Sequence, residues 1–216
     1  GTLEYVVVEY SGLEVAPEKE LNGITFGGVG SGTTVSYVQV HEGQDDGFEW
    51  FGGTVDGDHL IATAQGDDGF DVDVGFTGSI EYALNVQDDA SNSGIEAGDK
   101  AFEGFNTEVN FSKVTIVDNE EEKDASLNIK ANVEVNIDGL LMVGSTSGEG
   151  NVPAGLLVND ESKDNISITN GYYTGAFGSV ESENVAGTLM EVADAVMADG
   201  FTAKADSDAA DYAAVK

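Results

Sequence analysis

Carboxylate side chains recur every 21 to 25 residues in the first hundred residues. The segment 44–53 reads QDDGFEWFGG and the segment 66–75 reads GDDGFDVDVG, so that paired acids, a glycine and alternating acidic and apolar residues return after 22 residues. Three acids occupy the equivalent position in successive copies: Glu49, Asp71 and Glu96. Pairs of aspartates precede them: Asp45–Asp46, Asp67–Asp68 and Asp88–Asp89. Such a set suits two kinds of chemistry, cation binding and acid–base catalysis.

Calcium is the cation that these residue types favour. It prefers oxygen ligands, and both carboxylates and backbone carbonyls at glycine-rich corners supply them. The candidate ligands are the six paired aspartates Asp45, Asp46, Asp67, Asp68, Asp88 and Asp89. The strict nonapeptide repeat of calcium-binding β-rolls is absent. A simpler interpretation stays open, in which the acids form a solvated surface suited to a saline medium and the aspartates bond to the backbone of their own turns.

Catalysis is the alternative use of the same side chains. Two carboxyl groups a few ångströms apart can act as acid and nucleophile, or as acid and base, in glycoside hydrolysis. If the chain is an enzyme, the candidate catalytic residues are therefore Glu49, Asp71 and Glu96.

Two interleaved series of short strands must position these acids. One series opens at glycines 23, 47, 69, 94 and 155, and the other contains runs such as 35–40, 80–86 and 109–116. A period in the low twenties with glycine-rich corners predicts a β-solenoid, in which equivalent residues of successive coils form ladders. Phe48, Phe70 and Ile95 then stack inside, as do Trp50, Val72 and Ala97. Strand alternation places the ladder of Glu49, Asp71 and Glu96 outside, between Thr25 and Asn128.

An aromatic position recurs in the second series. Its members are Tyr5, Tyr37, His59, Tyr82 and Phe111. Because the other members are aromatic, we expect His59 to pack in an aromatic ladder rather than to act as a catalytic base or a metal ligand.

The alternation of GVGSGTTVSYVQV (28–40) with DDGFEWFGGTV (45–55) resembles secreted bacterial right-handed parallel β-helix proteins. These are often surface lipoproteins, mostly of unassigned activity, and the resemblance covers residues 1–185. It implies an all-β, right-handed parallel β-helix of about seven coils, located outside the cell or on its surface. Glycosidases and lyases of that architecture place acids on neighbouring coils. This chain lacks the arginine that such lyases commonly use as a base.

The two ends of the chain differ from the repeats. Residues 186–200 have apolar positions at helical spacing and a terminal glycine, which predicts a short amphipathic helix that caps the last coil. Residues 201–216 form an acidic, alanine-rich tail. The first strand begins almost at Gly1 without a preceding cap. Either further coils precede it, which we favour, or this end meets another molecule.

Composition limits the partners. The net charge of −33 excludes sequence-independent binding to nucleic acid, and no apolar run is long enough for membrane insertion. There is no cysteine, and so no disulfide or thiolate chemistry. We therefore expect a non-catalytic extracellular structural or adhesion β-solenoid, with calcium as its candidate cofactor. Its candidate partners are further copies of itself, arranged end to end or laterally and in the limit as filaments, or an extracellular polysaccharide. The alternative is an enzyme that binds or cleaves polysaccharide.

Overall fold

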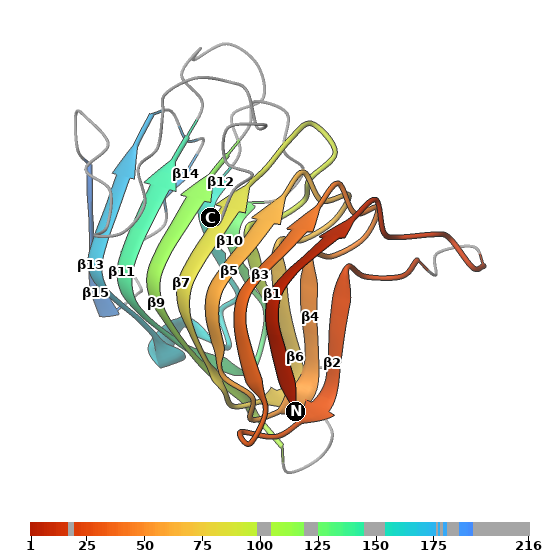
Figure 1. Ribbon diagram of the computed structural model, residues 1–216. Coiled ribbons are helices and arrows are strands. Elements are labelled where there is room, and N and C mark those ends of the chain that lie inside the picture. Colours follow the sequence, from red (N-terminus) through yellow and green to blue (C-terminus); the bar gives the residue numbers. More distant parts are fainter. Residues whose placement is uncertain are drawn as a thin grey trace.

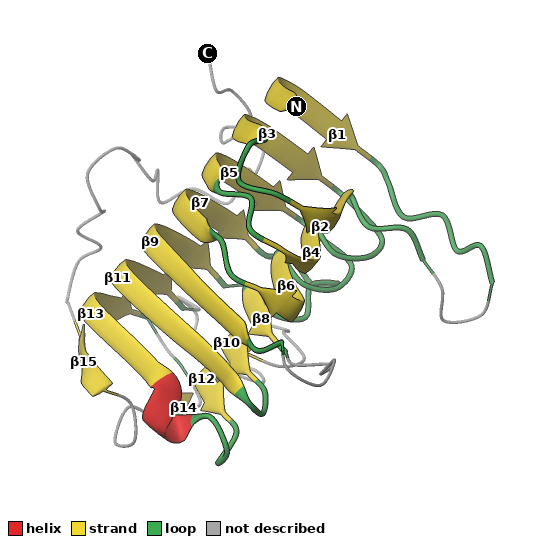
Figure 2. Ribbon diagram, turned by 90° about the horizontal axis from the view of Figure 1, so that it is seen from below, coloured by secondary structure: helices red, strands yellow, loops and turns green. Residues whose placement is uncertain are grey.

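The structure is a computed structural model, and it describes residues 1–16, 20–98, 105–118, 125–144, 154–175, 177, 179–180 and 186–191. Within these ranges the strands succeed one another along a single axis, from β1 at one end to β15 at the other (Figures 1 and 2). The chain passes alternately through two sheets, and every described strand pairing is parallel. The predicted parallel β-helix of about seven coils is confirmed.

The odd-numbered strands form an eight-stranded sheet and the even-numbered strands a seven-stranded one. The eight-stranded sheet contains β1 (Thr2–Glu9), β3 (Thr34–His41), β5 (Gly57–Thr63), β7 (Ser79–Val86), β9 (Thr107–Val117), β11 (Val133–Val143), β13 (Ile166–Thr174) and β15 (Ala186–Glu191). The seven-stranded sheet contains β2 (Ile24–Val29), β4 (Phe48–Gly53), β6 (Phe70–Phe76), β8 (Ile95–Ala97), β10 (Ala125–Ile129), β12 (Ala154–Val158) and β14 (Ser179–Val180). A single turn of 3-10 helix, η1 (Lys163–Asn165), precedes β13.

Ladders of apolar side chains fill the space between the two sheets. Phe48 pairs with Phe70, which pairs with Ile95, and all three side chains are fully buried. Their neighbours Trp50, Val72 and Ala97 form a second predicted ladder. Full burial of one such large apolar side chain stabilises a fold by about 1.5–3 kcal/mol. These inner ladders, rather than the charged outer face, therefore hold the coils together.

Glycines at the corners let successive coils stack closely. A Cβ atom at Gly47 would lie 2.7 Å from the carbonyl oxygen of Gly69 and 3.0 Å from the Cβ of Ala62. One coil further, a Cβ at Gly69 would lie 2.8 Å from the carbonyl oxygen of Gly94. Because backbone atoms cannot yield as a flexible side chain would, these positions exclude larger residues. The regular glycine spacing in the sequence is thus a packing requirement of the coil.

Each strand of the eight-stranded sheet curves, as Figure 1 shows. In each of β1, β3, β5, β7 and β9 one residue has a left-handed backbone, with φ between 53° and 56°: Tyr5, Tyr37, His59, Tyr82 and Lys113. Gly139 and Asn170 continue this column with positive φ. Regular pairing continues on both sides, for example Glu4 with Ser36 and Val6 with Val38. We call these residues the kink column.

The rings of the kink column stack on one another. Centroid separations are 5.0 Å between Tyr5 and Tyr37, 4.5 Å between Tyr37 and His59, and 4.4 Å between His59 and Tyr82. His59 therefore packs as expected. The prediction for Phe111 was wrong, because Phe111 pairs with Ile80 inside the core and Lys113 takes the ladder position, with Nζ 4.1 Å from the centre of the Tyr82 ring. A slip of two residues leaves strand alternation unchanged, so the apolar pattern could not detect it.

The predicted capping helix over 186–200 is wrong over its first six residues. Ala186–Glu191 is strand β15, which pairs with β13. Leu189 lies opposite Gly171, where a Cβ would come within 2.6 Å of the leucine side chain, so Leu189 packs over a position that has no side chain. Pairing with β15 also satisfies backbone groups of β13 that an axial helix would leave open. The β-helix therefore extends past residue 185. Residues 192–200 and the tail 201–216 lie outside the described residues.

Candidate metal centre

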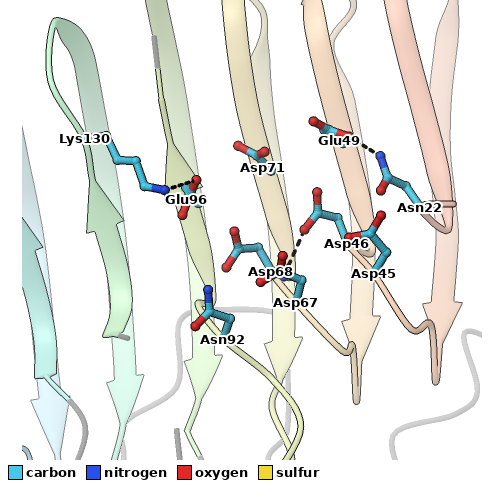
Figure 3. Close-up of a pocket in the computed structure, with 10 residues that line it drawn as sticks. All are labelled: Asn22, Asp45, Asp46, Glu49, Asp67, Asp68, Asp71, Asn92, Glu96 and Lys130. Atoms are coloured by element: carbon cyan, nitrogen blue, oxygen red, sulfur yellow. Dashed lines mark hydrogen bonds and ion pairs between the residues drawn. The ribbon is translucent and has the colours of Figure 1, made fainter. Parts of the chain in front are cut away.

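A ladder of polar side chains runs across the outer face of the seven-stranded sheet. The strand pairings place Thr25, Glu49, Asp71, Glu96 and Asn128 in one register, as predicted. Glu49 and Asp71 are buried, with 6% and 7% of their surfaces exposed. The corner beside the ladder contributes further acids, and together these side chains line a cavity of about 270 Å³ (Figure 3). We call this cavity the acidic pocket; its lining residues are Asn22, Asp45, Asp46, Glu49, Asp67, Asp68, Asp71, Asn92, Glu96 and Lys130.

Two corner aspartates are fixed by the backbone of the following coil. The Asp46 Oδ1 accepts a hydrogen bond from the Asp68 backbone N–H at 3.0 Å, and the Asp68 Oδ1 accepts one from the Ser93 N–H at 2.8 Å. Asp45 and Asp67 precede them at equivalent places and also line the pocket. Asp46 and Asp68 thus join neighbouring coils and also line the cavity; these hydrogen bonds reach the backbone of the next coil and not, as the simpler interpretation predicted, that of their own turns.

The third predicted pair lies elsewhere. Asp88 forms a local turn, in which its Oδ1 accepts hydrogen bonds from the Ala90 N–H at 3.0 Å and the Ser91 hydroxyl at 3.3 Å. Neither Asp88 nor Asp89 lines the pocket. The corner of this coil is longer, and Asn92 and Ser93 take the places that Asp67 and Asp68 hold one coil earlier. The structure therefore brings together four of the six candidate aspartates, together with Glu49, Asp71 and Glu96.

The crowding of acids changes their proton affinities. Burial, with the nearby charges of Asp71, Asp68 and Glu49, raises the pKa of Asp46 to about 10. Burial also raises the pKa of Asp68 well above its ordinary value, and Glu96, Asp67 and Asp71 add to this. For Asp45, burial and then Asp67 raise the pKa. Without a bound cation, the pocket therefore retains protons at neutral pH.

Each end of the ladder carries a nitrogen donor. At one end the Asn22 side-chain amide donates to Glu49, and also to the Thr25 hydroxyl at 3.2 Å. At the other end the Lys130 ammonium lies 2.6 Å from the Glu96 Oε1, while the Asn128 amide donates to the Glu96 Oε2 at 3.2 Å. Figure 3 shows that Asp46, Asp68 and Asp71 lie between these ends.

Two groups of carboxylates are spaced to hold a cation. One consists of Asp46, Glu49 and Asp71, all buried, and the other of Asp45, Asp46 and Asp67. Within each group the ligand oxygens all lie within 4.8 Å of one another. Calcium binds oxygen at about 2.3–2.6 Å, so ligands on opposite sides of the ion are about 5 Å apart. The residues present therefore fit this ion.

Three residues of the pocket were missed in the sequence: Asn22, Asn92 and Lys130. A signal existed for Lys130, because it follows Asn128 by two residues and strand alternation places both on the outer face. No comparable signal marked Asn92, whose position depends on the length of its corner.

Comparison with known sequences supports the architecture. Residues 1–214 match the family described as a pectate-lyase-like β-helix domain. No curated protein and no solved structure gave a significant match. Among the described residues, no helix has the length and apolar character needed to span a membrane.

Proposed function

We propose that this chain, which belongs to the pectate-lyase-like β-helix family, is a non-catalytic extracellular β-solenoid that binds calcium in its acidic pocket. The observation that carries the proposal is the convergence of Asp46, Glu49 and Asp71 from two neighbouring coils. All three are buried, so water cannot fully screen their mutual repulsion. A bound divalent cation would relieve this repulsion and use every carboxylate of the group.

The grouping of the carboxylates favours a cation over acid–base cleavage of a polysaccharide. Glycosidases use a pair of carboxyl groups with different roles on either side of the scissile bond. Asp46, Glu49 and Asp71 instead form a group of three in which one oxygen of each lies within 4.8 Å of the others, and one cation can use all three. The chain also contains no arginine.

Calcium is favoured over magnesium for two reasons. Magnesium requires oxygen ligands at about 2.0–2.1 Å in a near-ideal octahedron and keeps several waters, whereas calcium accepts irregular sets of six to eight oxygens at longer distances. Fixed carboxylates on rigid strands cannot contract around a small ion, and an irregular set of carboxylates suits the larger one.

The test is thermal unfolding of the metal-free protein with added calcium or magnesium. At a calcium concentration about a hundredfold above Kd, binding stabilises the fold by about 2.7 kcal/mol. For a chain of this size that corresponds to a rise in Tm of about 5–10 °C. We expect magnesium to give a much smaller shift.

Two variants test whether the rise in Tm with calcium depends on the acidic pocket. Glu49→Gln and Asp71→Asn should lose most of the calcium shift, because each removes a charged ligand. The matched control is Glu134→Gln, which removes the same charge from an exposed position on the eight-stranded sheet, where Glu134 pairs with Glu108. An equal calcium shift in all three variants, or none in the unaltered chain, would overturn the proposal.

A further inference from the structure

One strip of the outer face of the eight-stranded sheet is covered instead of being exposed to solvent. It consists of the residues two places after the kink column in five successive strands, β3 to β11, and the strand pairings hold them in one register. Its members are Gln39, Ile61, Leu84, Thr115 and Leu141, with only 0–6% of their surfaces exposed. We call these residues the outer strip.

Strand alternation places the outer strip on the side of the sheet that faces away from the core. In β11, Leu140 and Met142 belong to the core cluster between the two sheets, whereas Leu141 between them does not. Ile61 and Leu84 are likewise buried without belonging to that cluster. The low exposure of the outer strip therefore results from a layer outside the two sheets.

The strands themselves do not hide this face. Before the kink, Asn110 and Glu134 lie on the outer face of β9 and β11, and both are exposed although neighbouring strands flank them. Val7 of β1 pairs with Gln39 and thus continues the register of the outer strip, but it is 58% exposed. The covering layer therefore begins at β3 and extends at least to β11.

The described corners do not supply this layer. Those that follow β3, β5 and β7 stack on the corner of the preceding coil through backbone hydrogen bonds: Gln44 N–H to the Ser11 carbonyl, Gly66 N–H to the Gly43 carbonyl and Asn92 N–H to the Asp67 carbonyl. They continue the coil and do not fold back over the sheet. Within the described ranges every strand belongs to one of the two sheets, and the single helical turn η1 precedes β13.

Residues 192–216 have the length and composition that the outer strip requires. They follow β15 directly, and six strand spacings, about 29 Å, separate β15 from β3. A segment of 25 residues spans about 37 Å even as a helix. It contains nine alanines and the larger apolar residues Val192, Val196, Met197, Phe201, Tyr212 and Val215.

Two shorter segments, which follow the strips of β9 and β11 along the chain, suit the position less well. Segment 119–124 reads NEEEKD and has no apolar residue, and segment 145–153 reads STSGEGNVP and has one aliphatic side chain, Val152. Polar segments of this kind gain little from packing on leucine and isoleucine side chains.

We propose that residues 192–216 return along the outside of the solenoid and dock on the outer strip. Their apolar side chains pack on Ile61, Leu84 and Leu141, so that one segment ties five coils together. This interaction surface lies on the eight-stranded sheet, whereas the acidic pocket lies on the seven-stranded one. The docking therefore does not depend on calcium.

The experiment is a cysteine-pairing scan in the full chain. The chain contains no cysteine, so introduced cysteines pair only with one another. Thr115→Cys is combined in turn with each of four changes in the C-terminal segment: Val192→Cys, Val196→Cys, Met197→Cys and Phe201→Cys. We expect at least one pair to form an intramolecular disulfide under oxidising conditions, because a disulfide needs Cα atoms only about 4.4–6.8 Å apart. Mass spectrometry of the monomer detects it.

The matched control is Asn110→Cys with the same four partners, since Asn110 lies on the outer face of the same strand but is exposed. It should form no disulfide. Free thiols in every Thr115→Cys pair, or equal pairing from Asn110→Cys, would overturn the proposal. A disulfide-linked dimer of the Thr115→Cys single variant would overturn it in favour of a second copy of the chain as the covering layer.

A second measurement leaves the solenoid unaltered. Val196→Asp combined with Met197→Asp adds two charges to the C-terminal segment alone, and we expect it to increase ANS fluorescence and to speed amide hydrogen exchange in β5 to β11. Val152→Asp should change neither. Unchanged exchange in the double variant would contradict the docking, and faster exchange in Val152→Asp alone would assign the cover to segment 145–153. Both experiments are run with calcium and with a chelator, so that their result is independent of the proposed calcium function.

Discussion

Asp46 accepts a backbone hydrogen bond from the next coil while other carboxyl groups surround it. The hydrogen bond favours the ionised form, but burial and the charges of Asp71, Asp68 and Glu49 outweigh it and raise the pKa to about 10. The unfolded chain would ionise the same group near pH 3.8. Between these values the folded protein retains a proton that the unfolded protein has released.

The stability of the metal-free protein should therefore fall with increasing pH. The contribution of Asp46 is fully present below about pH 4 and is lost as pH rises through about 10. Asp46→Asn keeps the acceptor oxygen for the Asp68 N–H and removes the ionisation. One pKa unit corresponds to about 1.4 kcal/mol, so we expect this variant to be more stable than the unaltered chain by at least about 1 kcal/mol at pH 8.

Urea unfolding in the presence of a chelator, from pH 5 to pH 9, measures this difference. The control is Asp138→Asn, because Asp138 is exposed and the hydrogen bonds from Asn170 and Thr169 lower its pKa. That variant should keep the pH slope of the unaltered protein. The same slope in Asp46→Asn would contradict the proposed protonation.

At the residue scale, alternation was sufficient to predict the ladder. The period of two along a strand, combined with the steps of 22 and 25 residues between corner glycines, placed Glu49, Asp71 and Glu96 correctly. It could not place Asp88 and Asp89, because a longer corner shifts the residues that face the pocket and no local pattern specifies which ones turn inward. Lys130 was missed because its partner is one coil away and long side chains reach beyond the strand that carries them.

At the scale of the strand, the kink column combines a backbone requirement with a side-chain ladder. A left-handed residue with a side chain costs roughly 1–2 kcal/mol. Each pair of stacked rings stabilises the fold by about 0.5–1.5 kcal/mol beyond the effect of burial. His59 has a ring on each side, Tyr37 and Tyr82, and its Nδ1 lies 2.8 Å from the Asp58 carboxylate. The stacking therefore offsets most of the strain at this position.

Three substitutions at His59 separate the cost of its left-handed backbone from the stabilisation by ring stacking. His59→Tyr keeps the ladder and should leave the free energy of unfolding within about 0.5 kcal/mol. His59→Gly relieves the backbone strain but loses both ring contacts. His59→Val loses the rings and also places a β-branched residue at φ 53°, so it should be the least stable, by about 2 kcal/mol or more. Denaturant unfolding gives the order, and a valine variant as stable as the tyrosine variant would contradict it.

The predicted helix over 186–200 was wrong over its first six residues because of strand pairing. Apolar residues around 189–200 recur at helical spacing, but Leu189 also satisfies strand alternation, and the edge of β13 supplies backbone partners. Helix propensity is a local preference, whereas the open edge and the space over Gly171 are set by the preceding coil. A single sequence does not show that competition.

At the scale of the whole molecule, charge opposes association and the first coil favours it. The chain carries a net charge of −33. Its first coil exposes several large apolar side chains: Tyr5, Val7, Tyr10 and Leu13, each more than half exposed. End-to-end association through this coil is therefore a proposal whose outcome depends on salt, because the Debye length falls from about 10 Å at 0.1 M to 3 Å at 1 M.

Analytical ultracentrifugation over a range of protein and NaCl concentrations tests this proposal. We expect monomers at low salt and a mass that rises with protein concentration at 1 M NaCl. Val7→Lys should suppress the rise, because a lysine on an edge strand opposes pairing. Asn110→Lys adds the same charge at an exposed position away from the first coil and should have little effect. A monomer under every condition would refute association through this coil.

The stacking of coils along one axis also determines how the molecule would bear a load. Tension along that axis would open the ladders one coil at a time, and the 22-residue coil from Asp46 to Asp68 would release a contour length of about 75 Å. Asp46 already links its coil to the next through the Asp68 N–H. An ion shared by Asp46, Glu49 and Asp71 would add a second link between the same two coils. The solenoid would then resist extension most strongly around the acidic pocket and yield first elsewhere.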